Sequence, residues 1–176
     1  MKKLTLYIIL MLSATSFAQS FFDKYEDMDD VTSVVVTDEM FKMIGSIEPE
    51  GQQAKEEVGV LKQLTGLKVF STENAQIASR MLNEAKVFVN QKSMKELMRI
   101  NDNDANVKFY VVKGNQPYIA KELVMLLTGK HADKQTVVMS LTGDIDLRKL
   151  SKLNSKIKVV DKKYLEDVEK KMEGNN

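Results

Sequence analysis

The sequence predicts a single domain of the α+β class, in which an antiparallel β-meander sheet carries helices packed on one face. Its 176 residues fit one domain, because domains commonly hold ~100–200 residues. Hydrophobic residues make up 43% and charged residues 29%, the balance of an ordinary folded protein. In the second half, β-rich segments are joined by connectors of four to six residues, a spacing that favours hairpins.

A strand followed by a helix opens the domain. The valine-rich run 31–36 is typical of a strand, since β-branched side chains favour extended backbone. The residues after it predict a helix that Thr37 or Asp38 caps and Gly45 ends. The apolar face of this helix is expected to hold Met40, Phe41 and Ile44.

A short helix and then a second strand-to-helix unit follow. Residues 55–64 predict a short helix and residues 67–71 a strand. A long helix follows, with Ser71 or Thr72 as its expected cap. Apolar residues recur in it at helical spacing, which predicts that it lies on the sheet: Ala78, Met81, Leu82, Ala85, Phe88 and Val89.

The meander and the C-terminal part follow. Its strands are predicted at 94–101, 107–113, 118–128 and 136–142. Gly143 is interpreted as the end of the last strand, and Asp144 or Asp146 as the cap of a short helix that carries Leu147, Leu150 and Leu153. A further strand over 157–160 and a final helix that begins at Asp161 complete the chain. The apolar face of the final helix holds Tyr164, Leu165, Val168 and Met172.

Residues 1–18 have the pattern of a secretory signal peptide. Lys2 and Lys3 precede the apolar run 4–12, and small residues at Ser16 and Ala18 suit cleavage after position 18. The run is too short for a membrane anchor, since nine residues of helix rise about 14 Å against a ~30 Å hydrocarbon core. Gln19 would follow the cut, so the chain has no cysteine there for lipidation. We expect an acidic, solvated segment over 19–30 and the domain over 31–173.

Composition excludes several classes of function. A formal net charge of +1 argues against a nucleic-acid binder. The chain has no cysteine and one histidine, so it lacks thiol catalysis, disulfides and any two-histidine motif. No other stretch is long and apolar enough for an integral membrane segment. We therefore expect no cofactor, no metal and no catalytic residues.

Three candidate sites have simpler explanations. Asp102, Asp104 and Asn106 alternate like calcium ligands, but Val107 and Lys113 stand where a calcium loop needs glycine and glutamate. Asn/Asp-rich turns explain them more simply. Asp144 and Asp146 are a possible carboxylate pair, for which helix capping is the favoured interpretation. His131 is interpreted as an exposed turn residue.

A basic stretch after position 145 is the candidate interaction surface. Its residues suit an anionic headgroup, a glycan or an acidic protein, although a solvated helical face is the simpler interpretation. The members proposed for the surface are Arg148, Lys149, Lys152, Lys156 and Lys158.

The meander and its exit also carry a resemblance. The segments KFYVV (108–112), VMSLTGDIDL (138–147) and LSKL (150–153), together with the valine-rich strand before a Met-Phe helix, resemble the DUF4252 family of exported Bacteroidetes proteins. The resemblance implies an exported domain from a Gram-negative envelope and assigns no catalytic residues.

These observations predict a non-enzymatic, exported envelope protein, periplasmic or secreted, that binds another envelope protein or itself. The strand over 118–128 and the basic surface are the expected contact regions. A carrier of a small apolar or lipid ligand is the alternative, and it needs a cleft between helices and sheet. A hydrolase that uses Asp144 and Asp146 is a third hypothesis.

Overall fold

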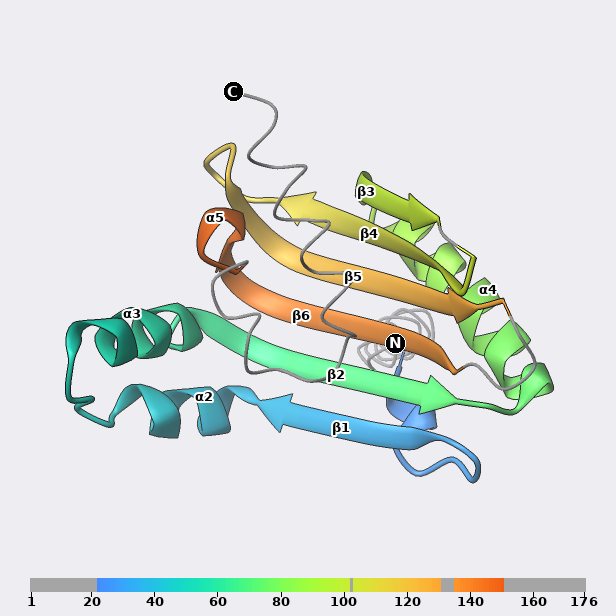
Figure 1. The fold of residues 1–176 in the computed structure, drawn as a ribbon, viewed down its shortest axis with the longest axis horizontal. Helices are drawn as coiled ribbons and strands as arrows, with labels where there is room; N and C mark the ends of the chain where they lie inside the picture. The colour runs from blue at the N-terminus through green and yellow to red at the C-terminus, as the bar shows by residue number, and fades with distance from the viewer. Residues whose placement is uncertain (1–21, 102, 131–134, 151–176) are drawn as a thin grey trace, which may run out of the picture.

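The computed structural model describes residues 22–101, 103–130 and 135–150. They form a six-stranded antiparallel sheet with helices beside it (Figure 1). The strands are β1 (Thr32–Thr37), β2 (Leu64–Thr72), β3 (Lys95–Asn101), β4 (Ala105–Lys113), β5 (Ile119–Gly129) and β6 (Thr136–Asp146). The helices are the 3-10 helix η1 (Asp23–Tyr25), α2 (Asp38–Gly45), α3 (Gln52–Leu61), α4 (Ala75–Gln91) and α5 (Leu147–Leu150). The predicted α+β class is confirmed.

The strand order is β1-β2-β6-β5-β4-β3. β3 to β6 follow one another as the predicted meander, and β1 and β2 join the meander through β6. Val69 of β2, for example, lies opposite Met139 of β6. Within the described residues, β1 and β3 are therefore the two edges of the sheet, and β5 and β6 occupy its centre.

The helix α4 covers one face of the sheet. Its buried residues recur every fourth position, as a single helical face requires: Ile77, Met81, Ala85 and Val89. They form one apolar cluster with sheet residues that include Phe70, Val124 and Val138. The prediction that this helix lies on the sheet is confirmed.

The cap of α4 differs from the prediction. The Asn74 side chain accepts hydrogen bonds from the backbone N–H of Gln76 at 3.0 Å and of Ile77 at 3.2 Å, which satisfies two of the otherwise unpaired donors at the helix start. Ser71 and Thr72 were the wrong candidates because β2 extends through Thr72. The Thr72 hydroxyl donates instead to the Asp30 carbonyl at 2.6 Å.

The stretch before β1 is part of the core. Phe22 is 2% exposed and Tyr25 0% exposed, and the Phe70 ring centroid lies 5.9 Å and 6.0 Å from theirs. The neighbouring acids Asp23 and Glu26 both accept hydrogen bonds from the Lys68 ammonium group. Burial alone would lower the pKa of Lys68. The hydrogen bonds and charges of Asp23 and Glu26 outweigh this effect, so the pKa of Lys68 is raised. The predicted solvated segment is wrong here because two aromatic side chains lie among the acids.

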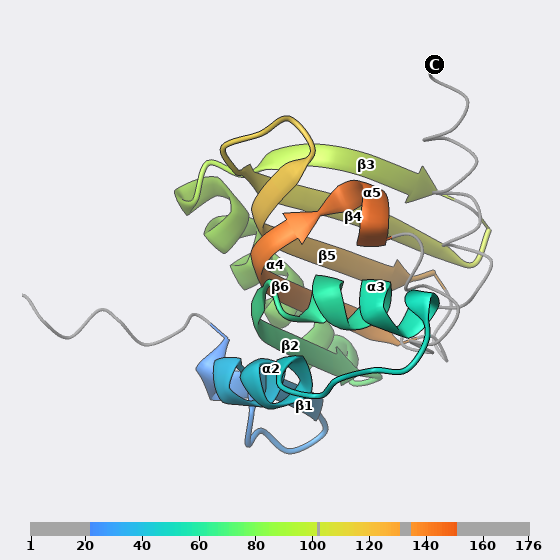
Figure 2. The same ribbon diagram turned by 90° about the vertical axis from the view of Figure 1, so that its left-hand side faces the viewer.

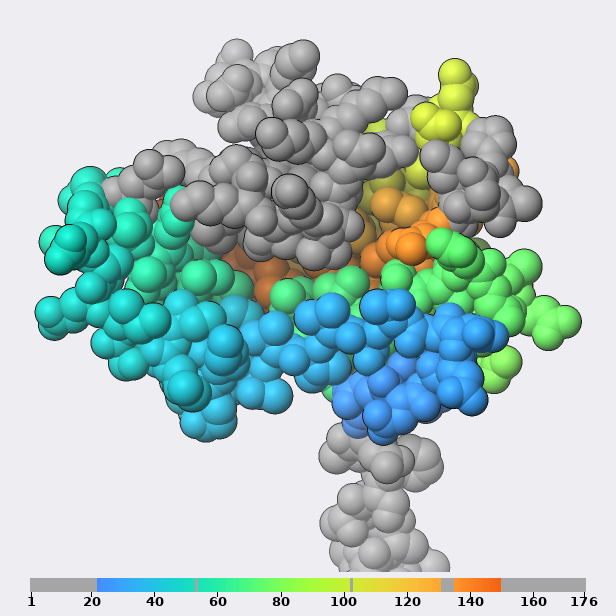
Figure 3. Space-filling view, turned by 60° about the horizontal axis from the view of Figure 1, so that its bottom comes forward, coloured from blue at the N-terminus to red at the C-terminus, as the bar shows by residue number. Residues whose placement is uncertain are grey.

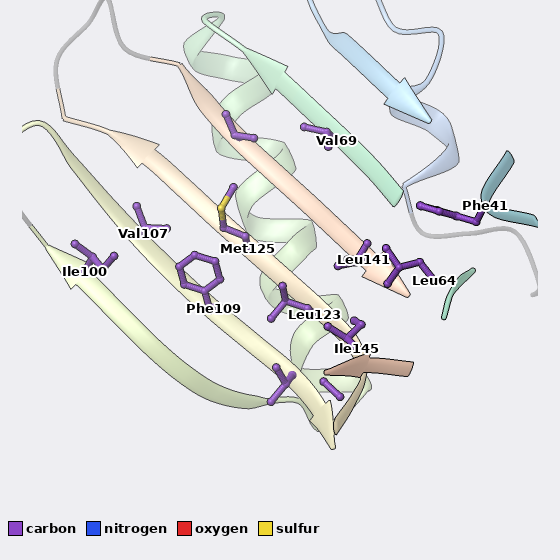
Figure 4. Close-up of a cluster of buried hydrophobic side chains, with 13 residues drawn as sticks. Phe41, Leu64, Val69, Ile100, Val107, Phe109, Leu123, Met125, Leu141 and Ile145 are labelled. Carbon is purple, nitrogen blue, oxygen red and sulfur yellow. The ribbon is translucent and has the colours of Figure 1, made fainter. Parts of the chain in front are cut away.

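The opposite face of the sheet carries a second apolar cluster, which we call the open-face cluster (Figure 4). Its sheet residues are Leu64, Val69, Ile100, Val107, Phe109, Val111, Ala120, Leu123, Met125, Val137, Leu141 and Ile145. Of the described helices, α2 adds Phe41, α3 adds Leu61 and α5 adds Leu147. Helices thus contribute to both faces, whereas the sequence placed them on one; Figure 2 shows α4 on one side and α3 and α5 on the other.

Strand β6 is longer than predicted. It passes through Gly143, which lies opposite Leu64, and continues to Asp146. Gly143 adopts a φ of 132°, a conformation that glycine reaches without strain, so the strand bends at this residue instead of ending. Asp146, and not Asp144, caps α5 by accepting a hydrogen bond from the Arg148 backbone N–H at 3.1 Å.

None of the helices in the described ranges combines the length and apolar character that crossing a bilayer requires.

Candidate interaction surfaces

The first residue of the predicted basic surface, Arg148, forms an ion pair. Arg148 donates from Nε to Asp146 Oδ1 at 3.0 Å and from Nη2 to Oδ2 at 2.7 Å. The Arg148 guanidinium carbon also lies 3.5 Å from the centroid of the Tyr118 ring, a stacked geometry that suits a planar cation. The side-chain and backbone hydrogen bonds from Arg148 outweigh burial and lower the pKa of Asp146. Arg148 is therefore engaged within the domain.

The structure describes only part of the predicted basic surface. Lys149 is exposed beside Arg148, while Lys152, Lys156 and Lys158 lie outside the described residues. The basic surface stays a prediction, and its first member has a structural role.

Arg148→Gln is expected to lower the free energy of unfolding at about pH 7 by more than a neutral surface change does, because the buried Asp146 carboxylate loses its charged partner. The folded-state pKa of Asp146 lies below its usual value, so this contribution is present above pH ~4 and is lost as pH falls through the folded pKa. The difference between the two proteins should therefore shrink towards about pH 2, as measured by urea unfolding at both pH values.

Lys149→Gln, which removes the same charge from the adjacent exposed residue, is the matched control and should cost less than about 0.5 kcal/mol. Equal losses for Arg148→Gln at both pH values would show that the Asp146 pair does not carry the effect.

The carboxylate pair of the hydrolase hypothesis is divided between two ion pairs. Asp144 accepts a hydrogen bond from the Lys121 ammonium group, and Asp146 binds Arg148. The lowered pKa of Asp146 makes this one carboxyl group a poor proton donor near neutral pH. The favoured interpretation, a helix cap, is confirmed for Asp146.

The described part of the chain contains neither the predicted calcium site nor a site built on the single histidine. Asp102 and His131 lie outside it. Asn106 belongs to β4, where it pairs with Asn101 and Thr128, and Asp104 is exposed in the preceding turn. Among the residues that the structure describes, no group of three or more His, Cys, Asp or Glu side chains is placed to hold a metal ion.

A buried carboxylate ties the end of α4 to the sheet. Glu122 of β5 is 8% exposed; its Oε2 lies 3.2 Å from Lys92 Nζ and its Oε1 lies 3.4 Å from Ser140 Oγ. Further along the same interface Met81 and Ala85 are 0% exposed. Side chains therefore fill the space between these parts of α4 and the sheet.

Strand β5 cannot serve as a docking edge. The sequence proposed the strand over 118–128 as a contact region, but β5 is paired with β4 on one side and β6 on the other. Its backbone donors and acceptors are thus used within the sheet. The pairing excludes edge docking at this strand, which the sequence could not reveal because a hydrophobic pattern identifies a strand without giving its neighbours.

An exposed apolar surface lies instead along β1 and α2. Seven large apolar side chains of the described residues are exposed, and five of them belong to this region, which we call the β1–α2 rim. They are Val34 (49% exposed), Val35 (40%), Met40 (49%), Met43 (66%) and Ile47 (59%). β1 leads directly into α2, and Figure 3 shows both elements, coloured blue to cyan, along the border that faces the viewer.

The two edges of the sheet differ in their protection. β3 carries Lys95, Glu96 and Arg99, and a register shift interrupts its pairing with β4. Charges and irregular pairing are ways in which proteins prevent edge strands from joining other strands. β1 has the sequence TSVVVT, without charge or proline, and pairs with β2 in unbroken register from Thr32 to Thr37.

Both ends of β1 are acidic. Asp29 and Asp30 precede the strand, and Asp38 and Glu39 follow it. Lys42 lies 2.6 Å from an Asp38 oxygen and 3.1 Å from a Glu39 oxygen, so it balances only one of the two charges at the second end. The β1–α2 rim therefore combines an apolar, uncharged centre with negatively charged flanks.

Sequence reasoning missed this surface. It assigned Met40 to the buried face of α2, but only Phe41 is fully buried there. The available signals were the valine run between two acidic pairs and the positions of Met40, Met43 and Ile47, which recur three and four residues apart as a second helical stripe.

Comparison with known proteins finds a family whose description is "Domain of unknown function (DUF4252)", matched over residues 25–153. The match includes all six strands. No curated protein and no solved structure matches the chain.

Proposed function

Because the chain belongs to the DUF4252 family, whose name assigns no activity, we propose a function from its surface. It is a non-enzymatic binding domain that takes up an extended segment of a partner protein as an additional strand beside β1. The unprotected edge of β1 carries this proposal. Strand addition draws its affinity from main-chain hydrogen bonds and its specificity from the side chains beside them.

The charges beside β1 favour a particular partner. Two copies of β1 paired antiparallel would bring Asp29 and Asp30 of one copy next to Asp38 and Glu39 of the other, and like charges in contact disfavour such a pairing. A segment with an uncharged, β-branched centre and lysine or arginine at both ends would instead meet opposite charges. We therefore propose a basic-flanked segment of another protein as the occupant.

A synthetic peptide with a central run of alternating valine and threonine and two lysines at each end tests this proposal. Its binding is measured by NMR titration of the backbone amides and compared with that of the same peptide flanked by glutamates. We expect shifts along β1 and at least tenfold tighter binding of the lysine-flanked peptide at low salt, a difference of about 1.4 kcal/mol. Added salt should reduce the preference.

Two edge variants locate the site. Val35→Lys places a charge on the β1 edge and should abolish binding, whereas Leu97→Lys makes the matched change at the β3 edge, where Leu97 is 49% exposed, and should leave binding unchanged. Shifts confined to β3, or equal binding of both peptides, would contradict the proposal. A concentration-dependent dimer that Val35→Lys dissociates would assign the edge to a second copy instead.

Export is part of the proposed function. The predicted signal peptide over 1–18 lies outside the described residues, and its removal would leave a soluble chain that begins at Gln19, without a lipid anchor. Intact mass spectrometry of the protein from its native host should give the mass of residues 19–176. The mass of the complete chain would contradict export by this route.

A further inference from the structure

The open-face cluster is buried more completely than the described helices explain. Val107 of β4 is 0% exposed and Met125 of β5 is 1% exposed. Sheet neighbours such as Ile100 and Leu127 flank these side chains only from the sides, because side chains stand outward from a sheet. A sheet face of this kind needs a second layer packed against it.

The described helices supply that layer over one part of the face only. Their contributions to the cluster are Phe41, Leu61 and Leu147. Phe41 comes from α2, which packs against β1, β2 and α3, and β4 and β3 lie at the far side of the sheet order. Leu147 comes from α5, which packs against β6, so the main packing partners of α2 and α5 among the described strands are β1, β2 and β6.

The chain leaves the described region on this same face. Leu147 of α5 packs against the open-face cluster, and residues 151–176 follow. The sequence pattern of this segment predicts a helix from Asp161 with an apolar stripe. Tyr164, Leu165, Val168 and Met172 recur on one side of it, and Glu166 and Lys170 fall on the other.

We propose that the segment 151–176 docks on the open-face cluster, with the stripe of Tyr164, Leu165, Val168 and Met172 facing β4 and β5. The dimensions allow it. Ten residues from 151 to 160 span up to about 33 Å when extended, and a helix over 161–174 is about 21 Å long. The cluster extends across five strands, a width of about 19 Å at 4.8 Å per strand.

The absence of native cysteine allows a direct test. Val107→Cys places a single thiol in the cluster of the complete mature chain, and its rate of reaction with a maleimide reports how well the face is covered. We expect slow labelling in the otherwise unchanged chain. Adding Leu165→Asn and Val168→Asn should accelerate labelling at least about tenfold by favouring the undocked state.

Two controls separate docking from general loosening. Glu166→Asn with Lys170→Asn makes two substitutions on the opposite side of the same predicted helix and should leave the rate unchanged. Val87→Cys places a thiol on α4, where Val87 is 48% exposed, and should react rapidly in every background. A Val107→Cys chain that ends at Leu150 should also react rapidly if it folds. The variant with Leu165→Asn and Val168→Asn tests docking even if the shortened chain does not fold.

Three results would overturn the proposal. The Val107→Cys thiol of the complete chain reacts as fast as the Val87→Cys thiol; its slow reaction is unaffected by Leu165→Asn with Val168→Asn; or its protection disappears on dilution, which would identify a second copy as the cover. None of these results concerns β1. The proposal that residues 151–176 dock on the open-face cluster can therefore be wrong while the proposed binding of a partner strand at β1 is right, and the reverse.

Discussion

Replacing Phe70 with alanine is expected to lower the free energy of unfolding by about 3–5 kcal/mol. The Phe70 side chain is 1% exposed and joins the segment before β1, through Phe22 and Tyr25, to the cluster under α4. Its loss leaves a cavity where these three parts meet. A domain typically has about 5–15 kcal/mol of stability, so the variant should unfold at a clearly lower urea concentration.

Far-UV circular dichroism during urea unfolding measures this effect. Val87→Ala removes apolar atoms from an exposed position of α4 and should change stability by less than about 0.5 kcal/mol. A loss below about 1 kcal/mol for Phe70→Ala, within the range of ordinary surface changes, would mean that this part of the core repacks around the cavity.

Gly143→Ala should be similarly severe, with an expected loss of about 2–4 kcal/mol from backbone strain and overpacking together. The φ of 132° disfavours any side chain. An added Cβ would also overlap the Gln63 carbonyl oxygen and lie 2.6 Å from the Leu64 Cα. Both contacts are with backbone, which cannot rotate away as a side chain can.

Gly59→Ala is the matched control for this substitution. Gly59 lies within α3, and an added Cβ there meets nothing within 4 Å. The helix propensity of alanine should stabilise this variant by about 0.5–1 kcal/mol. Thermal unfolding of the two variants should therefore shift the midpoint in opposite directions, and a neutral Gly143→Ala would contradict the close approach of β6 to the start of β2.

The sequence predicted the elements of this fold better than their ends. Periodic apolar positions identified α4, because burial of one face imposes a regular spacing on the residues themselves. Short turn-like connectors between β-rich segments identified the four meander strands. The extent of β6 was missed, since a glycine that ends a strand and one that bends it look alike until Leu64 is found opposite Gly143. The burial of Tyr25 was missed because its acidic neighbours dominate the local composition.

The candidate surfaces depended on information that local patterns do not contain. Whether the strand 118–128 offers an edge is decided by its neighbours, and its pairing with β4 and β6 arises from contacts between distant parts of the chain. The role of Arg148 likewise depends on Tyr118, which the β5–β6 pairing brings next to it. The helix cap at Asp146 was predictable because it involves only residues two positions apart.

The pairing of β2 with β6 has a consequence for the kinetics of folding. Thr72 faces Thr136 and Leu64 faces Gly143, so each of these contacts closes a loop of more than 60 residues. The hairpins of the meander close short loops and form within ~1–10 μs in isolation, whereas loop-closure entropy delays the pairing of distant strands. The meander should therefore assemble first, and β1 and β2 should dock onto β6 in the rate-limiting step.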